Sequence, residues 1–423
     1  MLDFRQWSRR RWITSSCIAL LACGLMGMAA GKAYRHYTLP ERIAQGQVLF
    51  EHEWTVDDAL SDGGDGLGPV FNEKSCVACH FQGGIGGGGP FEKNVTAFEV
   101  LPTSAGVEIL GGVVHASATQ PELLESMLLV SQRHPVIPGG VTVSDGCTTR
   151  RIDFNPVVHS SINTPALFGA GLIDELSSWS IRGAGLSRTA QLISENLDGD
   201  FTGTSVGRAR SLSAGRVGKF GWKGQFASLE EFVATACAVE LGLTNPQKSQ
   251  MAPRAFREDE GAALDMDATQ LDQLITYVAA LPRPVEVLPQ DPAEREKAIE
   301  GKKLFAEVGC ADCHTPDLGH VQGIYSDFRL YTIEPDHVTG YARVTTPVEL
   351  PSDHPKANEW KTPPLWGVAD SAPYFHDGGS PTLQHAILRH DGQSKRSREA
   401  FQSLSPAKRY ALLTFLDTLQ APR

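Results

Sequence analysis

The sequence is short of basic residues and of cysteine. Its 38 Lys and Arg stand against 49 Asp and Glu, which gives a formal charge of −11. Nucleic-acid binding normally requires a basic surface, so this function is set aside. Eight cysteines in 423 residues are too few for a disulfide-stapled scaffold. Hydrophobic residues at 41% and charged residues at 21% exclude a disordered chain, a collagen and a multi-span membrane protein.

Only one long apolar stretch is present, and it lies near the N-terminus. Residues 12–30 are mostly apolar and follow an arginine-rich segment at 5–11. This order is typical of a secretory signal. Because 19 residues are just enough to span a bilayer, an uncleaved anchor is the alternative. We therefore expect residues 1–32 to be a signal peptide or membrane anchor, and the protein to be periplasmic, either free or tethered to the inner membrane.

The chain repeats itself at long range. Segments of the first half recur in the second half in the same order: 46–50 and 301–305, 76–80 and 310–314, 164–169 and 362–367, and 222–224 and 376–378. Each half ends on a similar amphipathic segment, at 274–281 and at 412–419. A proline-rich joint lies between the halves, so the pattern predicts two related domains, 33–285 and 286–423.

Regular structure is expected to be mainly helical, with long loops. Residues 293–308 have helical spacing, and Ser405-Pro406 is a good start for the last helix. Residues 136–165 and 190–220 show no strong period and are predicted to be loops.

Two C-x-x-C-H segments give the main chemical signal. They are Cys76, Cys79 and His80 in the first half, and Cys310, Cys313 and His314 in the second. Two thiols followed by a histidine can attach a haem covalently and ligate its iron. A single such segment could be a zinc or redox site, but two in an exported, duplicated chain favour two haem c groups. The fold class that follows is mainly α, with two cytochrome c-like domains from an internal duplication.

Beyond the apolar stretch 12–30, Cys147 and Cys237 remain outside these two segments. In an oxidising compartment they could form a disulfide, and the alternative is two buried thiols.

The second axial ligand of each iron decides its reactivity. No methionine follows Met266, so the second half cannot supply its own methionine to the iron held by His314. His390 follows an amphipathic segment, where a distal ligand is expected, and we predict it as that ligand. In the first half, spacing does not distinguish the candidates, and the sixth position stays open; the candidates are His115, His134 and His159.

These features resemble the di-haem oxidoreductase branch, described as peroxidases or thiol oxidoreductases, of the bacterial di-haem cytochrome c peroxidase superfamily. The resemblance covers roughly residues 41–421. Its most specific segments are 66–72, 220–223, 240–246, 361–366 and 372–378.

The resemblance implies roles for individual residues. Trp222 matches the tryptophan between the two haems, and Glu240 matches the acid in the distal pocket of the peroxidatic N-terminal haem. His390 matches the position of the variable distal ligand, and Thr362 matches a residue near a calcium ion between the haems. The chain departs from its branch at Ser326–Tyr331, where a histidine is usual, and it lacks a clear counterpart of the releasable distal histidine. Core packing is the alternative for Trp222, and a surface acid is the alternative for Glu240.

We therefore expect an exported di-haem c-type oxidoreductase that resembles a peroxidase. It would take electrons in at the C-terminal haem from a small basic cytochrome c or another periplasmic donor, and reduce peroxide or a related oxidant at the N-terminal haem. The alternatives are a non-catalytic di-haem electron carrier, and an oxidase of a protein or organic substrate acting through high-valent haem. Iron is held by His80, His314 and His390 in this interpretation, and calcium is a further candidate cofactor.

Overall fold

The computed structural model describes residues 38–102, 109–123, 141–145, 148–152, 157–195, 206–250, 263–334 and 349–422. Within these ranges, no helix has the length and the apolar character that crossing a bilayer requires. The predicted signal or anchor at 1–32, with its apolar stretch 12–30, lies outside them.

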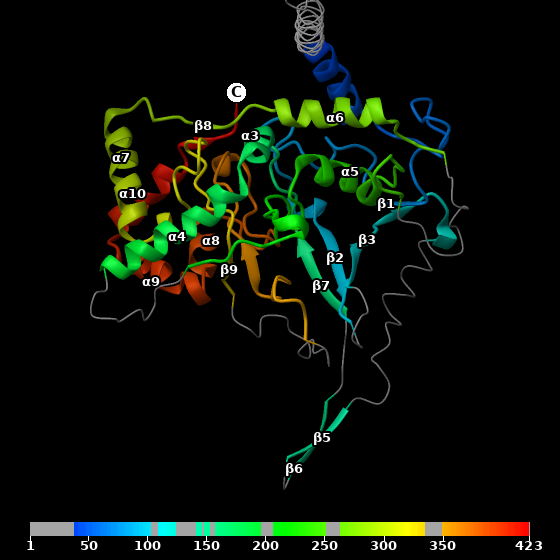
Figure 1. Ribbon diagram of the computed structural model, residues 1–423. Coiled ribbons are helices and arrows are strands. Elements are labelled where there is room, and N and C mark those ends of the chain that lie inside the picture. Colours follow the sequence, from blue (N-terminus) through cyan, green and yellow to red (C-terminus); the bar gives the residue numbers. More distant parts are fainter. Residues whose placement is uncertain are drawn as a thin grey trace, which may run out of the picture.

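The first half combines helices with a small antiparallel sheet (Figure 1). Its sheet has the strand order β3-β2-β7, and β1 and β4 form a separate two-stranded pair. The strands are β1 (Val70–Phe71), β2 (Val95–Val100), β3 (Leu110–Val114), β4 (Ser117–Ala118) and β7 (Val157–Ile162). The helices are residues 38–51, α3 (Ala170–Glu175), α4 (Ser178–Glu195), α5 (Leu229–Glu240) and α6 (Ala268–Ala280).

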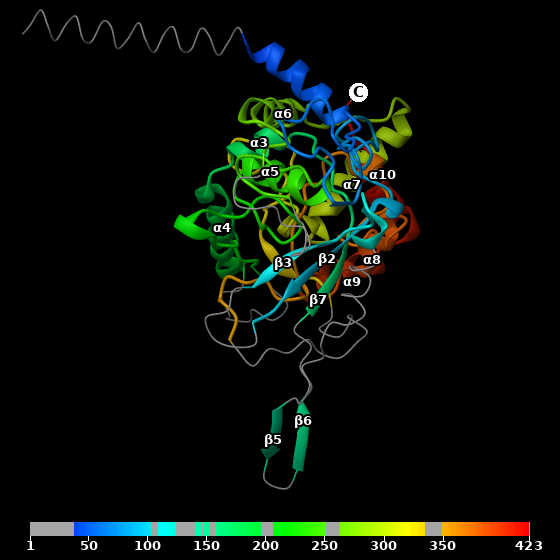
Figure 2. The ribbon, with the colours of Figure 1, turned by 90° about the vertical axis from the view of Figure 1, so that its right-hand side faces the viewer.

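The loop predicted at 136–165 is wrong in part. Strand β7 pairs with β2 over its whole length, from Val157 opposite Val100 to Ile162 opposite Val95. Strands β5 (Val141–Asp145) and β6 (Thr148–Ile152) form a hairpin that extends away from the rest of the chain (Figures 1 and 2). These segments are rich in Val, Thr and Ile, which favour extended backbone. The predicted loop 190–220 begins as helix, because α4 runs to Glu195.

The second half contains the two helices predicted for it, at 293–308 and after Ser405-Pro406, and two more. They are α7 (Pro292–Glu307), α8 (Leu383–Arg389), α9 (Lys395–Ser403) and α10 (Pro406–Leu416), with short strands β8 (Val285–Glu286), β9 (Leu330–Thr332), β10 (Glu359–Lys361) and β11 (Leu419–Gln420). Ser405 caps α10 by accepting the N–H of Lys408, and proline follows it. Strand β8 pairs with β11, so the joint between the halves is held by the end of the chain.

The first repeated segment of each half brings a glycine against its closing helix. A Cβ on Gly46 would lie 2.0 Å from the carbonyl oxygen of Gln273 in α6, and one on Gly301 would lie 1.9 Å from that of Ala411 in α10. Helices this close tolerate no side chain at the crossing. The glycines of the two G-x-x-L-F segments therefore have a common packing role.

The two halves are joined by reciprocal backbone hydrogen bonds. The N–H of Asn163 donates to the carbonyl of His376 at 2.7 Å, and the N–H of Lys361 donates to the carbonyl of Trp222 at 2.9 Å. The larger hydrophobic cluster also spans both halves, since Phe328 and Trp366 pack with residues of α5 and α6. The division at residue 285 stays a prediction.

Candidate active site

A large cavity lies in the first half, beside the first C-x-x-C-H segment. It encloses about 1900 Å³, its open mouth included, and Cys76, Cys79 and His80 line it. Most of the remaining wall is apolar and comes from β2, β3, α5 and α6. Glu240, the last residue of α5, and Trp222 complete the wall.

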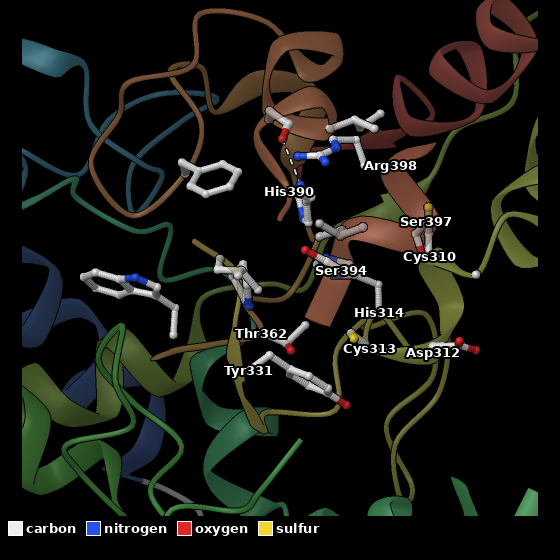
Figure 3. Close-up of a pocket in the computed structure, with 18 of the residues that line it drawn as sticks. Cys310, Asp312, Cys313, His314, Tyr331, Thr362, His390, Ser394, Ser397 and Arg398 are labelled. Atoms are coloured by element: carbon white, nitrogen blue, oxygen red, sulfur yellow. Dashed lines mark hydrogen bonds between the residues drawn. The ribbon is translucent and has the colours of Figure 1, made fainter. Parts of the chain in front are cut away.

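A second cavity lies in the other half and encloses about 1470 Å³, its mouth included. Cys310, Cys313 and His314 line it, as do His390 and Trp222. In Figure 3 the rings of His314 and His390 come from different segments and are directed toward the same space. Trp222 therefore lines both cavities.

Three histidines of the two cavities are oriented in the same way. The Nδ1 atoms of His80, His314 and His390 lie 3.2, 3.0 and 2.8 Å from the backbone carbonyls of Gly87, Tyr325 and Ala386, respectively. A backbone carbonyl can only accept, so each Nδ1 carries the proton. The lone pair of each Nε2 is then available to a metal.

The protonation state of these histidines suits ligation. Burial lowers the pKa of His80 to about 4 and that of His314 to about 4, and it also lowers the pKa of His390. All three imidazoles are therefore neutral at neutral pH, as a metal ligand must be.

The four cysteine thiols do not fit a redox or nucleophilic site. Burial raises the pKa of Cys76, Cys79 and Cys310 to about 12, and it raises that of Cys313 as well. Reactive thiolates have lowered pKa values instead. Paired thiols, a neutral histidine and a large apolar wall in each cavity fit a haem.

Glu240 is held by a hydrogen bond within the first cavity. The side-chain amide of Asn72 donates to its Oε2 at 2.6 Å. Burial raises the pKa of Glu240 above its ordinary value, while this hydrogen bond lowers it. Glu240 thus lies in a cavity wall and is bonded there, unlike the surface acid that was the alternative.

Of the three histidine candidates of the first half, His115 is the one whose side chain the structure describes. His115 is buried, and its Nε2 lies 2.8 Å from the carbonyl of Val239. His159 belongs to β7, where it pairs with Phe98, and His134 lies outside the described residues. Among the histidines whose side chains the structure describes, His80 is the one that lines this cavity.

Trp222 is fixed between the two halves. Its indole N–H donates to the carbonyl of Asn163 at 2.8 Å. Its ring lies 6.4 Å from the ring of His376, at an interplanar angle of 74°. The indole is thus bonded to Asn163 of the first half, and its ring lies near the ring of His376 of the second half.

Sequence reasoning missed a group that lies next to Trp222. His376 stacks on Trp360 with the ring centroids 3.4 Å apart, and Glu334 accepts from the Trp360 indole N–H and contacts His376 Nε2, each at 3.0 Å. His376 and Trp360 line the second cavity. The repeat contained a signal for this, because His376 occupies in the second half the place that Trp222 has in the first.

Thr362 is buried and its N–H donates to the carbonyl of Arg329. In the ranges that the structure describes, no three His, Cys, Asp or Glu side chains gather as a metal site would require. Calcium stays a prediction.

Cys237 is a free thiol in the hydrophobic core, and its proposed partner, Cys147, lies outside the described residues.

Comparison with known families gives one match that covers more than half of the chain. A family model described as "Di-haem oxidoreductase, putative peroxidase" matches residues 195–419. The match includes Trp222, Glu240, the second C-x-x-C-H segment and His390.

Individual relatives are more distant. A cytochrome c551 peroxidase of Nitrosomonas europaea is 26% identical over 185 residues, which are 43% of this chain and 52% of the relative. The chain thus matches about half the length of this relative. A solved hydrazine synthase of Kuenenia stuttgartiensis has a TM-score of 0.36 at 18% identity, over 62% of this chain and 73% of that one. A MauG-like protein associated with microbial copper homeostasis has a TM-score of 0.31 at 16% identity, over 49% and 71%.

Proposed function

We propose that this chain, which belongs to the di-haem oxidoreductase family, is an exported peroxidase that takes in electrons at its C-terminal haem and reduces peroxide at its N-terminal haem. Haem as the cofactor follows from the family. Covalent attachment through Cys76 and Cys79, and through Cys310 and Cys313, is part of the proposal, as are the direction of electron flow and the oxidant.

One observation supports this proposal most strongly: the two cavities share a tryptophan but differ in their other polar groups. The C-terminal cavity has a second histidine with an available Nε2, His390, across from His314. The N-terminal cavity has a carboxyl group, Glu240, in its wall instead. A six-coordinate iron transfers electrons, whereas an open position can bind a small substrate, so the two halves suit different tasks.

Reduction of hydrogen peroxide to two molecules of water consumes two protons and two electrons. A bound haem supplies the electrons and a site for the peroxide oxygen. Glu240 is placed to accept the proton of the oxygen that binds and to donate it to the oxygen that leaves. Burial raises the pKa of Glu240 above that of an exposed glutamate. The carboxyl group can therefore take up and release this proton closer to neutral pH.

Trp222 provides the connection between the cavities in this proposal. It lines both of them, and its hydrogen bond to Asn163 fixes the ring in place. The electron donor is proposed to be a small basic cytochrome c or another periplasmic protein, and the N-terminal segment 12–30 would tether the enzyme if it is not cleaved.

The substitution Glu240→Gln tests the proposal. It keeps the size and an acceptor for Asn72 but removes the exchangeable proton, so we expect peroxide turnover to fall by about 10²–10⁴-fold. Glu73→Gln is the matched control, because Glu73 lines the same cavity but pairs with Lys93.

Mass measurement of both variants should show two covalently attached porphyrins, so that loss of haem does not explain loss of activity. Unchanged turnover in Glu240→Gln would remove Glu240 from the mechanism. A matured protein without added porphyrin would refute the proposal as a whole.

A further inference from the structure

The segment Gly66–Asn72, which contains β1, has no role in the function proposed so far, although it ends next to Glu240. The N–H of Asn72 donates to the carbonyl of Glu240 at 2.8 Å, and its side-chain amide donates to the Glu240 carboxyl at 2.6 Å. The same residue therefore holds both the backbone and the side chain of Glu240.

Position 68 of this segment requires glycine, because its backbone lies directly against the backbone that follows α5. A Cβ on Gly68 would lie 2.3 Å from the carbonyl oxygen of Gly242, just beyond the end of α5. The N–H of Gly68 also donates to the carbonyl of Leu241. The segment Gly66–Asn72 thus packs directly against the one that carries Glu240, and this contact brings the amide of Asn72 within reach of the carboxyl.

Asn72 is itself fixed on its other side. Its Oδ1 accepts the N–H of Ala116 at 2.9 Å, next to the start of β4. With Oδ1 occupied by a backbone donor, the amide NH₂ must face Glu240, so the orientation of the side chain is not ambiguous. An NH₂ group only donates, and it therefore occupies Oε2 of Glu240 as an acceptor.

We propose that Asn72 is a positioning residue for Glu240: it fixes the carboxyl plane and reserves Oε2 as an acceptor, so that proton exchange with the substrate takes place at Oε1. This inference rests on the proposed function, because it concerns the proton transfer assigned to Glu240. It also gives the segment Gly66–Asn72 a structural role, because Asn72 connects the end of β1 to the end of α5.

Two substitutions separate this role from a merely structural one. Asn72→Leu removes both the donor and the acceptor of the side chain. Asn72→Asp keeps an acceptor for the N–H of Ala116 but places a second carboxyl group against Glu240. Glu73→Gln, a neighbour in the same cavity wall that does not bond Glu240, is the control.

The first readout is the infrared carbonyl band of protonated Glu240, identified by its loss in Glu240→Gln. A hydrogen bond to a carbonyl oxygen lowers its stretching frequency, so the band should move to higher frequency in Asn72→Leu and stay in place in the control. This measurement does not depend on turnover, and porphyrin mass confirms that the variants are loaded.

The second readout is the pH profile of peroxide turnover. Loss of the Asn72 donor should raise the pKa of Glu240, and since the unprotonated carboxylate starts the reaction, the acid limb should move to higher pH. In Asn72→Asp the two carboxyls share a proton, and the limb should move further. Turnover at neutral pH should fall roughly tenfold to a hundredfold in Asn72→Leu.

The outcomes are distinct. If Glu240→Gln loses turnover while the band and the acid limb are unchanged in both Asn72 variants, the inference is overturned and the proposed function stands. If Glu240→Gln retains turnover, the proposed function fails, and the role of Asn72 in catalysis fails with it. A shifted band together with a shifted acid limb supports the inference.

Discussion

At the scale of single residues, His390 shows how a short local contact orients a proposed iron ligand. It follows the last residue of α8, and its Nδ1 is bonded to the carbonyl of Ala386 within the same turn. This contact fixes both the tautomer and the direction of the ring. The lowered pKa, caused first by burial, keeps the imidazole neutral. The lone pair of Nε2 is then available to the iron that we propose for this site.

The variant His390→Met is expected to raise the reduction potential of the C-terminal haem. Methionine opposite histidine favours the ferrous state more than a second histidine does, and axial ligands tune haem over a range of about 0.8 V. Spectroelectrochemical titration measures the shift. His385→Met, an exposed position of the same helix, is the control and should leave the potential unchanged. Equal potentials in both variants would mean that His390 is not a ligand.

At the scale of elements, several helices begin at signals that are visible in the sequence. Asp267 and Gln270 form a capping box at α6, Asp291 precedes the proline of α7, and Ser405 precedes that of α10. Each cap satisfies N–H groups that the helix itself leaves unpaired. The strand β7 has no such signal, because its partner β2 lies about 60 residues earlier in the chain.

Asp265 joins three elements just before α6. Its carboxyl accepts the N–H groups of Gly66 and Thr244, and burial raises its pKa to about 6 from 3.8. Between these two pH values the folded chain binds more protons at this site than the unfolded chain does. The contribution of Asp265 to stability therefore falls as the pH rises from about 4 through 6 and is constant above that range.

The variant Asp265→Asn should lose this pH dependence. It also loses one backbone acceptor, so we expect it to be less stable than the parent protein at pH 4, with the difference narrowing toward pH 6–7. Urea unfolding midpoints across this range measure the effect. Asp62→Asn, at an exposed position of the segment that contains Gly66, is the control. A difference that is constant with pH would contradict the assigned shift.

At the scale of the whole molecule, the halves interlock around Trp222. The carbonyl of Trp222 accepts from Lys361, and its indole N–H donates to Asn163, whose own N–H donates to His376. Lys223 adds three further bonds, from its ammonium to the carbonyls of Lys356, Ala357 and Glu359 at 2.8–2.9 Å. These contacts fix the relative position of the two cavities. Electron transfer between two haems in them would require such a fixed arrangement.

The charge of the molecule leads to a prediction about its donor. With a formal charge of −11, the chain should attract a small basic cytochrome at low salt. The second-order rate of oxidation of such a donor should therefore fall as ionic strength rises, because the Debye length shortens to about 8 Å at 0.15 M. Stopped-flow measurements over a series of salt concentrations test this. A rate that rises with salt would contradict this prediction, because it would mean that the basic donor is repelled by the surface it approaches.

The sequence by itself determined the two C-x-x-C-H segments, the repeat, the capped start of the last helix and His390 as a candidate ligand. These features are local, since they depend on spacing and on neighbours within one turn of helix. Trp222 and Glu240 were proposed from resemblance, and the structure places both in the cavity walls.

Tertiary structure alone decided the rest. That Trp222 lines both cavities, that Asn72 holds Glu240 across 168 positions of sequence, and that His376 stacks on Trp360 are results of contacts between distant segments. The sheet β3-β2-β7 escaped prediction for the same reason. A hydrogen bond or a ring contact between remote residues leaves no periodic trace in a single sequence, because only the folded chain brings the two partners within bonding distance.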